Sequence, residues 1–173
     1  PGLRMHLQPS FGKGRPVGEA IIANMFAAGD DGRIPLVAVA GTNGKTTTVR
    51  LIAHILGQQG LRVGMTTTDG VYVEGRRIDT GDCSGPKSAR NVLLHPGVDA
   101  AVLETARGGV LREGLGFDRC DVAVVTNLGR GDHLGLSYLG TVEDLSVVKR
   151  VIVNNVRPGS GVAVLNAADP MVV

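Results

Sequence analysis

The sequence predicts an α/β fold with a mostly parallel central sheet, and three observations carry this prediction. Hydrophobic residues make up 43% of the chain, whereas aromatic residues make up only 3% and tryptophan is absent. A core built from Val, Leu, Ile and Ala is typical of a sheet that is buried on both faces. Short apolar runs alternate with segments of helical periodicity. A glycine-rich stretch follows the first of these runs, as in strand-loop-helix units.

The chain is predicted to comprise a linker or N-terminal extension, residues 1–33, and one folded domain, residues 34–173. The first segment opens with Pro, Gly and Arg, and its one helix candidate is the apolar run from Val17 to Phe26. The predicted strands and longer helices all follow this segment. A chain of 173 residues is long enough for one well-buried domain and too short for two of ordinary size.

Strands are predicted where short apolar runs end in polar residues or in glycine. The runs are residues 34–40, 62–67, 71–73, 76–78, 100–103, 122–125 and 161–165. The third and fourth runs flank Glu74-Gly75, a two-residue turn signal, and are expected to pair as a hairpin. Residues 80–86 are predicted to form a polar loop.

Helices are predicted where apolar residues recur at the spacing of one helix face. The first helix covers residues 47–59, ends at Gly60, and has an apolar face formed by Val49, Ile52, Ala53 and Leu56. A second helix over residues 87–94 stops before Pro96. A third follows Thr141, which with Asp144 resembles a capping arrangement. Its core face is expected to contain Val142, Leu145, Val148 and Ile152.

The stretch Gly41-Thr42-Asn43-Gly44-Lys45-Thr46-Thr47 is predicted to bind phosphate. Glycines let backbone N–H groups point at anionic oxygens, and the following helix adds the positive end of its dipole. Lys45 would reach the β and γ phosphates, and Thr46 would offer its hydroxyl to Mg²⁺. Val39 stands where the general motif has its first glycine, so only the Gly-Lys-Thr half is met. The alternative is a glycine-rich turn with an exposed lysine, but the strand-loop-helix context favours a three-layer P-loop fold like that of NTPases.

Polar residues follow two further predicted strands. Glu104 ends the run 100–103 and is expected to act as a second acidic Mg²⁺ ligand, the alternative being a strand-end glutamate in water. Asp132 and His133 lie beyond the run 122–125, and a lone histidine is more often structural than a ligand. Arg107-Gly108-Gly109 is predicted to be a flexible basic turn that holds an anionic substrate, or else a plain loop.

Charge and cysteine content argue against several other classes. The chain has 18 Lys and Arg against 16 Asp and Glu, with no basic block and no aromatic platform, so no nucleic-acid partner is expected. Cys83 and Cys120 show neither zinc nor redox spacing and are expected to be reduced thiols. No apolar run reaches the ~20 residues that a membrane helix needs. Together these features predict a cytoplasmic location.

Three segments resemble the signatures of the central domain of muramyl-peptide ligases. They are Gly41 to Thr46, Thr126-Asn127 followed by Asp132-His133-Leu134, and Asn166-Ala167-Ala168-Asp169-Pro170. Two departures stand out: four residues separate Asn127 from Asp132 where the family has three, and Ala168 replaces the usual first aspartate. The resemblance implies an ATP-dependent amide-bond ligase that phosphorylates a carboxylate and lets an amine displace the phosphate.

Further segments resemble the branch of this family that adds arginine, through its α-amine, to the β-carboxylate of a poly-aspartate chain. They are Arg4 to His6, Pro16 to Glu19, Thr66 to Gly70, Gly81 to Pro86, Leu103 to Leu115 and Gly131 to Leu136. The resemblance therefore implies ATP, arginine and a poly-aspartate chain as partners, with a possible homo-oligomer in the full-length enzyme. It leaves open whether lysine replaces arginine as the amine.

The resemblance also implies roles for particular residues. Lys45, Glu104 and His133 would be catalytic, with two Mg²⁺ ions held by Thr46, Glu104 and His133. Lys149, sixteen residues after His133, is a candidate for a carbamylated lysine that binds metal, or else a solvated helix lysine. The ATP-binding residues implied are Gly41, Thr42, Asn43, Gly44, Lys45, Thr46, Thr47, Asn127 and Asn166. The substrate residues implied are Thr67, Asp69, Ser84 and Arg107.

Relatives in this branch carry an ATP-grasp region before the linker and a third domain that closes on ATP. The chain is therefore expected to be a central domain that binds nucleotide weakly and turns over little by itself. Two other classes remain open: a small P-loop kinase or GTPase, and a nucleotide-binding module without catalysis. A GTPase should contain an Asn-Lys-x-Asp guanine reader, and no such tetrapeptide occurs in the sequence. Another amino-acid ligase of the same family is a further alternative.

Overall fold

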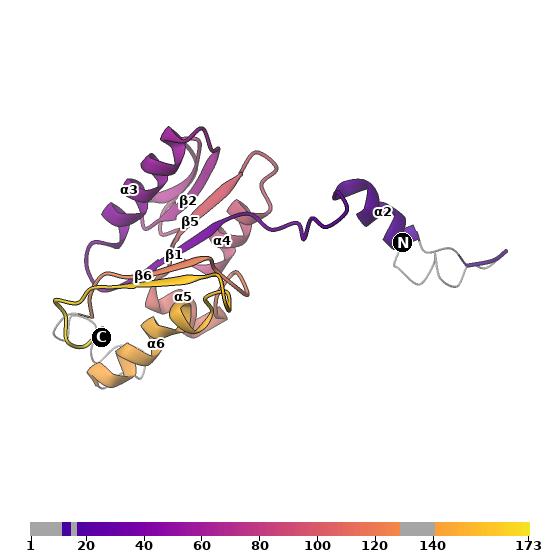
Figure 1. The fold of residues 1–173 in the computed structure, drawn as a ribbon. Helices are drawn as coiled ribbons and strands as arrows, with labels where there is room; N and C mark the ends of the chain where they lie inside the picture. The colour runs from indigo at the N-terminus through magenta and orange to yellow at the C-terminus, as the bar shows by residue number, and fades with distance from the viewer. Residues whose placement is uncertain (1–11, 15–16, 129–140) are drawn as a thin grey trace. The chain divides into compact units, whose positions relative to one another are not determined.

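The computed structural model describes residues 12–14, 17–128 and 141–173. Contacts within the chain divide it into two units, residues 1–33 and residues 34–173. In the first unit, helix α2 spans Val17–Met25, close to the predicted helix, and none of its residues is buried. The second unit contains the sheet, the other helices of the described residues and the hydrophobic core (Figure 1).

The second unit is built on a seven-stranded sheet in the described part of the chain, with the order β4-β3-β2-β5-β1-β6-β7. The strands are β1 (Leu36–Ala40), β2 (Val63–Thr67), β3 (Gly70–Val73), β4 (Arg76–Thr80), β5 (Ala100–Glu104), β6 (Val122–Val125) and β7 (Val162–Leu165). Strands β2, β5, β1, β6 and β7 run parallel, whereas β3 pairs antiparallel with both β2 and β4. The predicted mostly parallel α/β sheet and its hairpin are therefore confirmed.

Helices cover both faces of this sheet, which gives three layers. They are α3 (Lys45–Gln58), α4 (Pro86–Leu93), α5 (Arg107–Glu113) and α6 (Val142–Asn154). Alternate residues of β1 point to opposite faces, as the pleat of a strand requires. Val39 packs with Val49 of α3 in one apolar cluster. Ala38 and Ala40 belong to the cluster on the other face, with Ala89 of α4 and Ile152 of α6.

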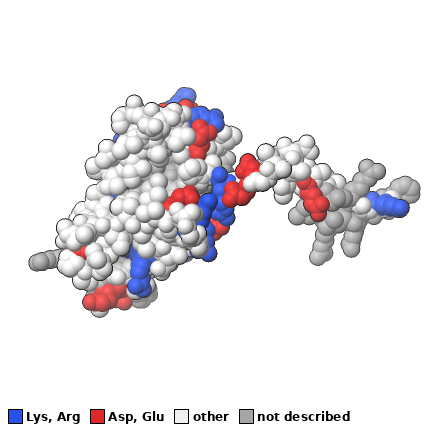
Figure 2. Space-filling view, viewed as in Figure 1, with Lys and Arg blue, Asp and Glu red and all other residues white. Residues whose placement is uncertain are grey.

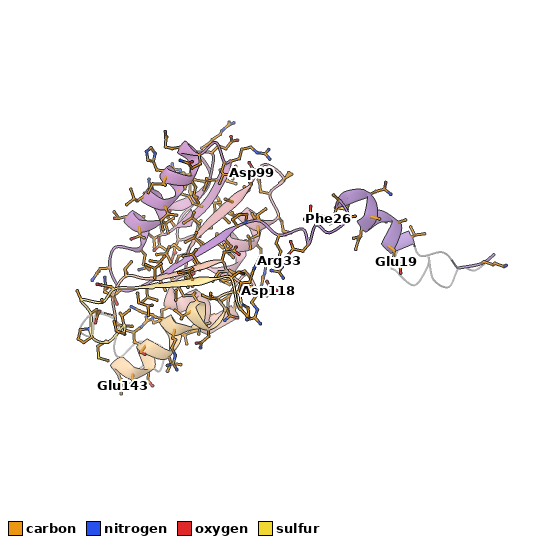
Figure 3. The ribbon with its side chains drawn as sticks, viewed as in Figure 1. Glu19, Phe26, Arg33, Asp99, Asp118 and Glu143 are labelled. Carbon is orange, nitrogen blue, oxygen red and sulfur yellow. The ribbon has the colours of Figure 1, made fainter. Side chains whose placement is uncertain are left out.

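Helix α6 begins at the capping box that the sequence predicts. The Thr141 side chain accepts a hydrogen bond of 3.1 Å from the Asp144 amide, and the Thr141 amide donates one of 3.1 Å to the Asp144 carboxylate. Glu143, labelled in Figure 3, adds negative charge to the first turn, where the helix dipole favours it. Leu145, Val148 and Ile152 are buried as expected. The side chain of Val142 lies outside the described residues.

Helix α5 corrects the sequence-based expectation for residues 107–109. These residues were expected to form a flexible basic turn, and glycine does disfavour helix. They instead form the first turn of a seven-residue helix. A Cβ at Gly109 would lie 3.0 Å from the Gly85 Cα and 3.2 Å from Pro86. Close approach to the start of α4 therefore accounts for glycine here, and packing overrides the local propensity.

The two edge strands are more exposed than the sequence suggests. All residues of β4 and β7 are exposed, whereas all five residues of β5 are buried. Val162 keeps 54% and Val164 keeps 49% of its surface accessible, although both belong to an apolar run. The run predicts the strand correctly, but position at the sheet edge decides how much of it is covered.

Three further properties concern the thiols, the surface charge and the length of the helices. Cys83 and Cys120 are buried free thiols, and burial raises the pKa of Cys120 to about 11. Figure 2 shows acidic and basic side chains interspersed on this face of the molecule, with no broad area of one sign. None of the helices in the described ranges is long and apolar enough to cross a bilayer.

Candidate functional site

The predicted site residues that the structure describes gather mainly at one edge of the sheet. The loop 41–44 joins β1 to α3, and Glu104 is the last residue of β5. Thr126 and Asn127 directly follow β6, and Thr68 directly follows β2. Because these four strands are parallel and adjacent, their carboxyl ends meet (Figure 1). Ligands of open α/β sheets bind at this edge.

Two glycines allow the shape of the loop. Gly41 has φ 147°, and a Cβ on it would lie 1.9 Å from Oγ1 of Thr126. Gly44 has φ 82° and occupies the N-cap of α3. Helix α3 therefore starts at Lys45, two residues before the predicted start, which places the Lys45 and Thr46 amides in its first turn. This arrangement suits anion binding at a helix N-terminus.

The loop is held from β6 by a set of hydrogen bonds. The Thr42 amide donates to the Asn127 carbonyl at 3.0 Å. The Asn127 side chain accepts from the Asn43 amide and donates to the Asn43 carbonyl, both at 3.0 Å. The Thr126 hydroxyl also donates to the Asn43 carbonyl, at 2.7 Å. Asn127, predicted from the sequence as an ATP contact, therefore shapes the loop directly.

Lys45, Thr46 and Glu104 come together beside the loop. The Thr46 hydroxyl donates to Oε2 of Glu104 at 2.8 Å, and Lys45 Nζ lies 3.9 Å from Oε1. Lys45 Nζ also donates to the Thr42 carbonyl at 3.0 Å. Only 2% of the Glu104 surface is accessible. The Glu104 carboxylate is therefore buried. The alternative interpretation, a strand-end glutamate in water, is wrong.

The oxygens of this cluster suit a hard divalent cation. In the described part of the chain, Oε1 of Glu104 is a buried side-chain oxygen that accepts no hydrogen bond. A buried polar atom without a partner is costly, and a cation would satisfy it. Carboxylate and hydroxyl oxygens are ligands that Mg²⁺ takes together with substrate phosphates. Among the same residues no group of three or more His, Cys, Asp or Glu side chains forms a metal cage.

Thr68 is a site residue that sequence reasoning missed. Its amide donates to Oε2 of Glu104 at 3.3 Å, and its hydroxyl lies 3.3 Å from that of Thr46. It stands between the two predicted substrate residues Thr67 and Asp69, in a run of three threonines. Strand alternation was the available signal, because an extended chain that continues one residue past the end of β2 at Thr67 would place Thr68 on the same side as Thr66.

Lys149 reaches the loop from α6. It is 5% exposed, and its amine donates to the Thr42 hydroxyl, which donates in turn to the Leu128 carbonyl. The alternative of a solvated helix lysine is therefore wrong. His133, which was expected to bind a second Mg²⁺ together with Glu104, lies outside the described residues, as does Asp132.

Asn166 lies at the same edge, at the end of β7. Its amide group donates to the Thr126 carbonyl at 2.9 Å, and its side-chain oxygen accepts from the Ala168 amide at 3.0 Å. Asp169 accepts a hydrogen bond of 2.8 Å from the Leu128 amide. The segment after β7 is therefore tied to the segment after β6, and Asn166 remains exposed.

Thr67 and Asp69, predicted to contact substrate, hold the turn between β2 and β3. Thr67 is fully buried and its hydroxyl donates to the Asp69 carboxylate. Asp69 also binds Arg50 of α3 at 2.6 Å and accepts from the Tyr72 hydroxyl at 3.2 Å. The hydrogen bond from Thr67, followed by those from Tyr72 and the charge of Arg50, lowers the pKa of Asp69.

Ser84 lies near Glu104 in space, and Arg107 follows Glu104 by three residues along the chain. Ser84 is buried, and its hydroxyl donates to the Asp82 carboxylate. Its carbonyl accepts a hydrogen bond of 3.1 Å from the Ala106 amide, two residues after Glu104. Arg107 is the first residue of α5. Ser84 and Glu104 also line one small pocket between α4, α5 and the end of β5.

Comparison with known proteins identifies the class. The family described as Mur ligase middle domain matches residues 39–173, and the chain belongs to this family. The chain is 53% identical to the cyanophycin synthetase of Synechocystis sp. over 172 residues, which is 99% of this chain and 20% of that protein. It thus spans about a fifth of the length of these curated relatives.

Solved structures agree with this assignment. The structure of UDP-N-acetylmuramoyl-L-alanyl-D-glutamate–2,6-diaminopimelate ligase has a TM-score of 0.64 at 33% identity, covering 79% of this chain and 27% of that one. The structure of E. coli FolC in complex with DHPP and ADP has a TM-score of 0.52 at 25% identity, covering 70% and 35%. The predicted fold class and family resemblance are therefore confirmed.

Proposed function

We propose that this chain is the nucleotide-binding domain of an ATP-dependent amide-bond ligase. The observation that carries the proposal is Glu104, a buried carboxylate with one oxygen unsatisfied among the described residues, beside Lys45 and Thr46. Phosphoryl transfer requires groups that hold the phosphates and a cation that neutralises them. The glycine-bounded loop at the N-terminus of α3 would supply the first, and the oxygens of Glu104 favour the second. The matched ligases, and the ADP bound to FolC, support this function.

The site residues would act by placing positive charge and hydrogen-bond donors around the nucleotide phosphates. Backbone amides of the loop and the start of α3 would hold the β phosphate, and the Lys45 ammonium would draw the γ phosphate toward Glu104. Thr46 and Glu104 would hold Mg²⁺, whose charge would neutralise phosphate oxygens. A substrate carboxylate oxygen forms a bond to the γ phosphorus as the bond to ADP breaks. An amine then attacks the acyl carbon, phosphate leaves, and the amine loses a proton.

Thr68 belongs to the proposed metal site because its hydroxyl lies beside that of Thr46. His133 would add a second cation position together with Glu104, as the family resemblance implies. In its unmodified form, the Lys149 ammonium donates to the Thr42 hydroxyl and supports the loop. A carbamylated Lys149 would present a carboxylate there, which would accept a hydrogen bond from the Thr42 hydroxyl instead.

The substrates proposed are a poly-aspartate carboxylate and the α-amine of arginine. Identity of 53% to a cyanophycin synthetase over nearly the whole chain supports this choice over another amino-acid ligase. Thr67 and Asp69 would act on substrate through the shape of their turn, while Ser84 and Arg107 flank the acceptor side of Glu104. We expect weak nucleotide binding and little turnover from this chain alone, because it spans a fifth of such a protein.

Calorimetric titration of the chain with Mg-ATP tests the phosphate loop. We expect saturable binding that Lys45→Ala abolishes, with Lys87→Ala, an exposed lysine in the first turn of α4, as the matched control. Equal binding by wild type and Lys45→Ala would contradict the proposed loop function. Absence of binding would assign completion of the site to the rest of the enzyme, and the longer protein would then be titrated.

A nucleotide-binding module without catalysis is the competing function. Glu104 distinguishes the two, because the loop can bind nucleotide without phosphoryl transfer. In the full-length enzyme we expect Glu104→Ala to abolish ADP release that depends on arginine and a poly-aspartate acceptor. Unchanged release would favour the competing function. Robust release from the present chain alone would contradict its expected dependence on other domains.

A further inference from the structure

The turn between β2 and β3 consists of two exposed residues, Thr68 and Asp69. Thr67, the last residue of β2, is fully buried, and its carbonyl accepts a hydrogen bond of 3.0 Å from the Cys83 amide. Burial therefore fixes the end of the strand. The two exposed residues that follow it depend on polar contacts for their position.

Helix α3 contacts both residues of this turn. Thr46 and Arg50 are four residues apart, so they share one face of α3 and are separated by about 6 Å along its axis. The Thr46 hydroxyl lies 3.3 Å from the Thr68 hydroxyl. Arg50 donates a hydrogen bond of 2.6 Å to the Asp69 carboxylate. Consecutive residues of the β2–β3 turn thus contact consecutive turns of the helix.

Tyr72 of β3 holds the Arg50 side chain in this orientation. The guanidinium carbon of Arg50 lies 5.2 Å from the centre of the Tyr72 ring. Nη2 of Arg50, which binds Asp69, also donates to the Tyr72 hydroxyl at 3.2 Å, and that hydroxyl donates to Asp69 at 3.2 Å. A planar guanidinium can stack on a ring and donate hydrogen bonds at the same time, whereas an ammonium is less suited to both.

The same turn reaches the cluster proposed to bind Mg²⁺. The Thr68 amide donates to Oε2 of Glu104 at 3.3 Å, and the Thr46 hydroxyl donates to the same oxygen at 2.8 Å. Mg²⁺ demands near-ideal octahedral geometry, so small displacements of its ligands matter. Residues that only orient metal ligands therefore affect metal affinity. A turn that moved away from α3 would carry the Thr68 hydroxyl away from Thr46.

We propose that Arg50 is a positioning residue for the magnesium site. Through Asp69 it restrains the β2–β3 turn, and this restraint keeps the Thr68 hydroxyl beside that of Thr46. The effect on Mg²⁺ rests on the proposed function. The restraint of Thr68 by Arg50 does not, because it concerns only contacts within the chain.

Electrostatics alone predicts the opposite effect of Arg50 on the cation. Loss of the Arg50 charge removes a repulsion and leaves the Asp69 carboxylate without this partner, so both changes would favour Mg²⁺. Loss of the restraint on Thr68 instead weakens Mg²⁺ binding, since the competent position of the turn is less populated. The sign of the change in Mg²⁺ affinity therefore distinguishes positioning from a direct effect of charge.

Hydrogen exchange at the Thr68 amide tests the restraint itself. We expect Arg50→Met to speed this exchange by about 5-fold in the chain without nucleotide or Mg²⁺, as loss of an exposed ion pair reinforced by stacking predicts. Arg62→Met is the matched control. It breaks the pair with Asp99, which is also 2.6 Å long and partly exposed but lies at the amino end of β5. Unchanged exchange in Arg50→Met would overturn the proposal.

The Mg²⁺ dependence of ADP release by the full-length enzyme tests the consequence. We expect Arg50→Met to raise the half-saturating Mg²⁺ concentration by about 5-fold and to leave the rate at saturating Mg²⁺ within about 2-fold, because excess cation restores the competent position of the turn. Arg50→Lys keeps the charge but not the stacked geometry, so its Mg²⁺ requirement should lie between the two. Arg62→Met should match wild type.

Thr46→Ala separates failure of this proposal from failure of the proposed function. A higher Mg²⁺ requirement in Thr46→Ala but not in Arg50→Met would overturn the positioning role alone. An unchanged requirement in both would contradict the proposed metal site, and exchange at the Thr68 amide would then decide the restraint by itself. A lower requirement in Arg50→Met, or a raised KM for the acceptor with an unchanged Mg²⁺ requirement, would also overturn the proposal.

Discussion

The carboxylates at the two ends of the parallel strands differ in burial and in hydrogen bonding. At the amino ends, Asp99, labelled in Figure 3, precedes β5 and receives three hydrogen bonds from Arg62 at 2.6 to 3.0 Å. Asp121 precedes β6, binds the Leu36 amide at 2.8 Å and pairs with Arg157 at 3.3 Å. At the carboxyl ends, Glu104 is 2% exposed and keeps one oxygen without a hydrogen bond in the described structure.

The hydrogen bonding of these carboxylates distinguishes two roles. Asp99 and Asp121 stabilise the fold, whereas Glu104 is suited to bind a ligand. Partly exposed ion pairs whose oxygens are satisfied contribute little individually and need nothing further. A buried carboxylate oxygen that accepts no hydrogen bond costs stability, and the ion pair with Lys45 at 3.9 Å only partly offsets this cost. Retaining such a group at the edge of the sheet where ligands bind is consistent with a stability–activity trade-off. The following variants test this contrast.

The largest expected effect is that of Glu104→Gln. In the full-length enzyme we expect amide-forming activity to fall at least about 100-fold, as for loss of one essential electrostatic contact. In the isolated chain without nucleotide or Mg²⁺, we expect the free energy of unfolding to change by no more than about 1 kcal/mol, because removal of the buried charge is offset by loss of its ion pair with Lys45. Urea unfolding and ADP release measure the two effects. A large loss of stability would instead assign Glu104 to the fold.

Gly41→Ala should have the next largest effect. The added Cβ would lie 1.9 Å from the Thr126 hydroxyl, at a φ of 147°. Overpacking and backbone strain together should destabilise the chain by about 2–4 kcal/mol and weaken Mg-ATP binding. Gly57→Ala is the control, since its Cβ meets open space within α3 and should stabilise by about 0.5–1 kcal/mol. Equal effects of the two substitutions would contradict a loop shaped by Gly41.

The smallest effect is expected at the amino ends. Hydrogen bonds from the Arg62 side chain and backbone lower the pKa of Asp99 to about 2. Because this pKa lies below the unfolded value of ~3.9, the stabilisation is present above about pH 4 and is lost as the pH falls toward 2. Asp99→Asn should therefore flatten the loss of stability over this range and leave Mg-ATP affinity unchanged. An identical acid slope in wild type and variant would contradict the role of this pair.

Local patterns predicted most of the fold correctly. The strands β1, β2, β5 and β6 match their apolar runs within two residues, and the hairpin turns at Glu74-Gly75. The capping box at Thr141 could also be predicted from the sequence, because it depends on two residues that are three positions apart. Such features follow from neighbours along the chain, so they need no knowledge of the tertiary arrangement.

Features that depend on distant contacts were missed. Helix α5 contains two glycines in its first turn and is explained by packing of Gly109 on Gly85 and Pro86. Thr68 was overlooked because its link to Thr46 and Glu104 joins three separate segments. The roles predicted for Asn166, Ser84 and Arg107 remain predictions, as does that of His133.

The sequence by itself determined the alternation of strands and helices, the glycine-rich loop between β1 and α3, and the family. Hydrophobic periodicity and a contiguous glycine-rich motif are encoded within short stretches of residues. Only the tertiary structure showed that Glu104 is buried with one oxygen that accepts no hydrogen bond in the described structure. It also showed that Lys149 donates to the Thr42 hydroxyl and that Asp69 forms an ion pair with Arg50. Burial and pairing depend on which segments the sheet order brings together, and that order is a property of the whole chain.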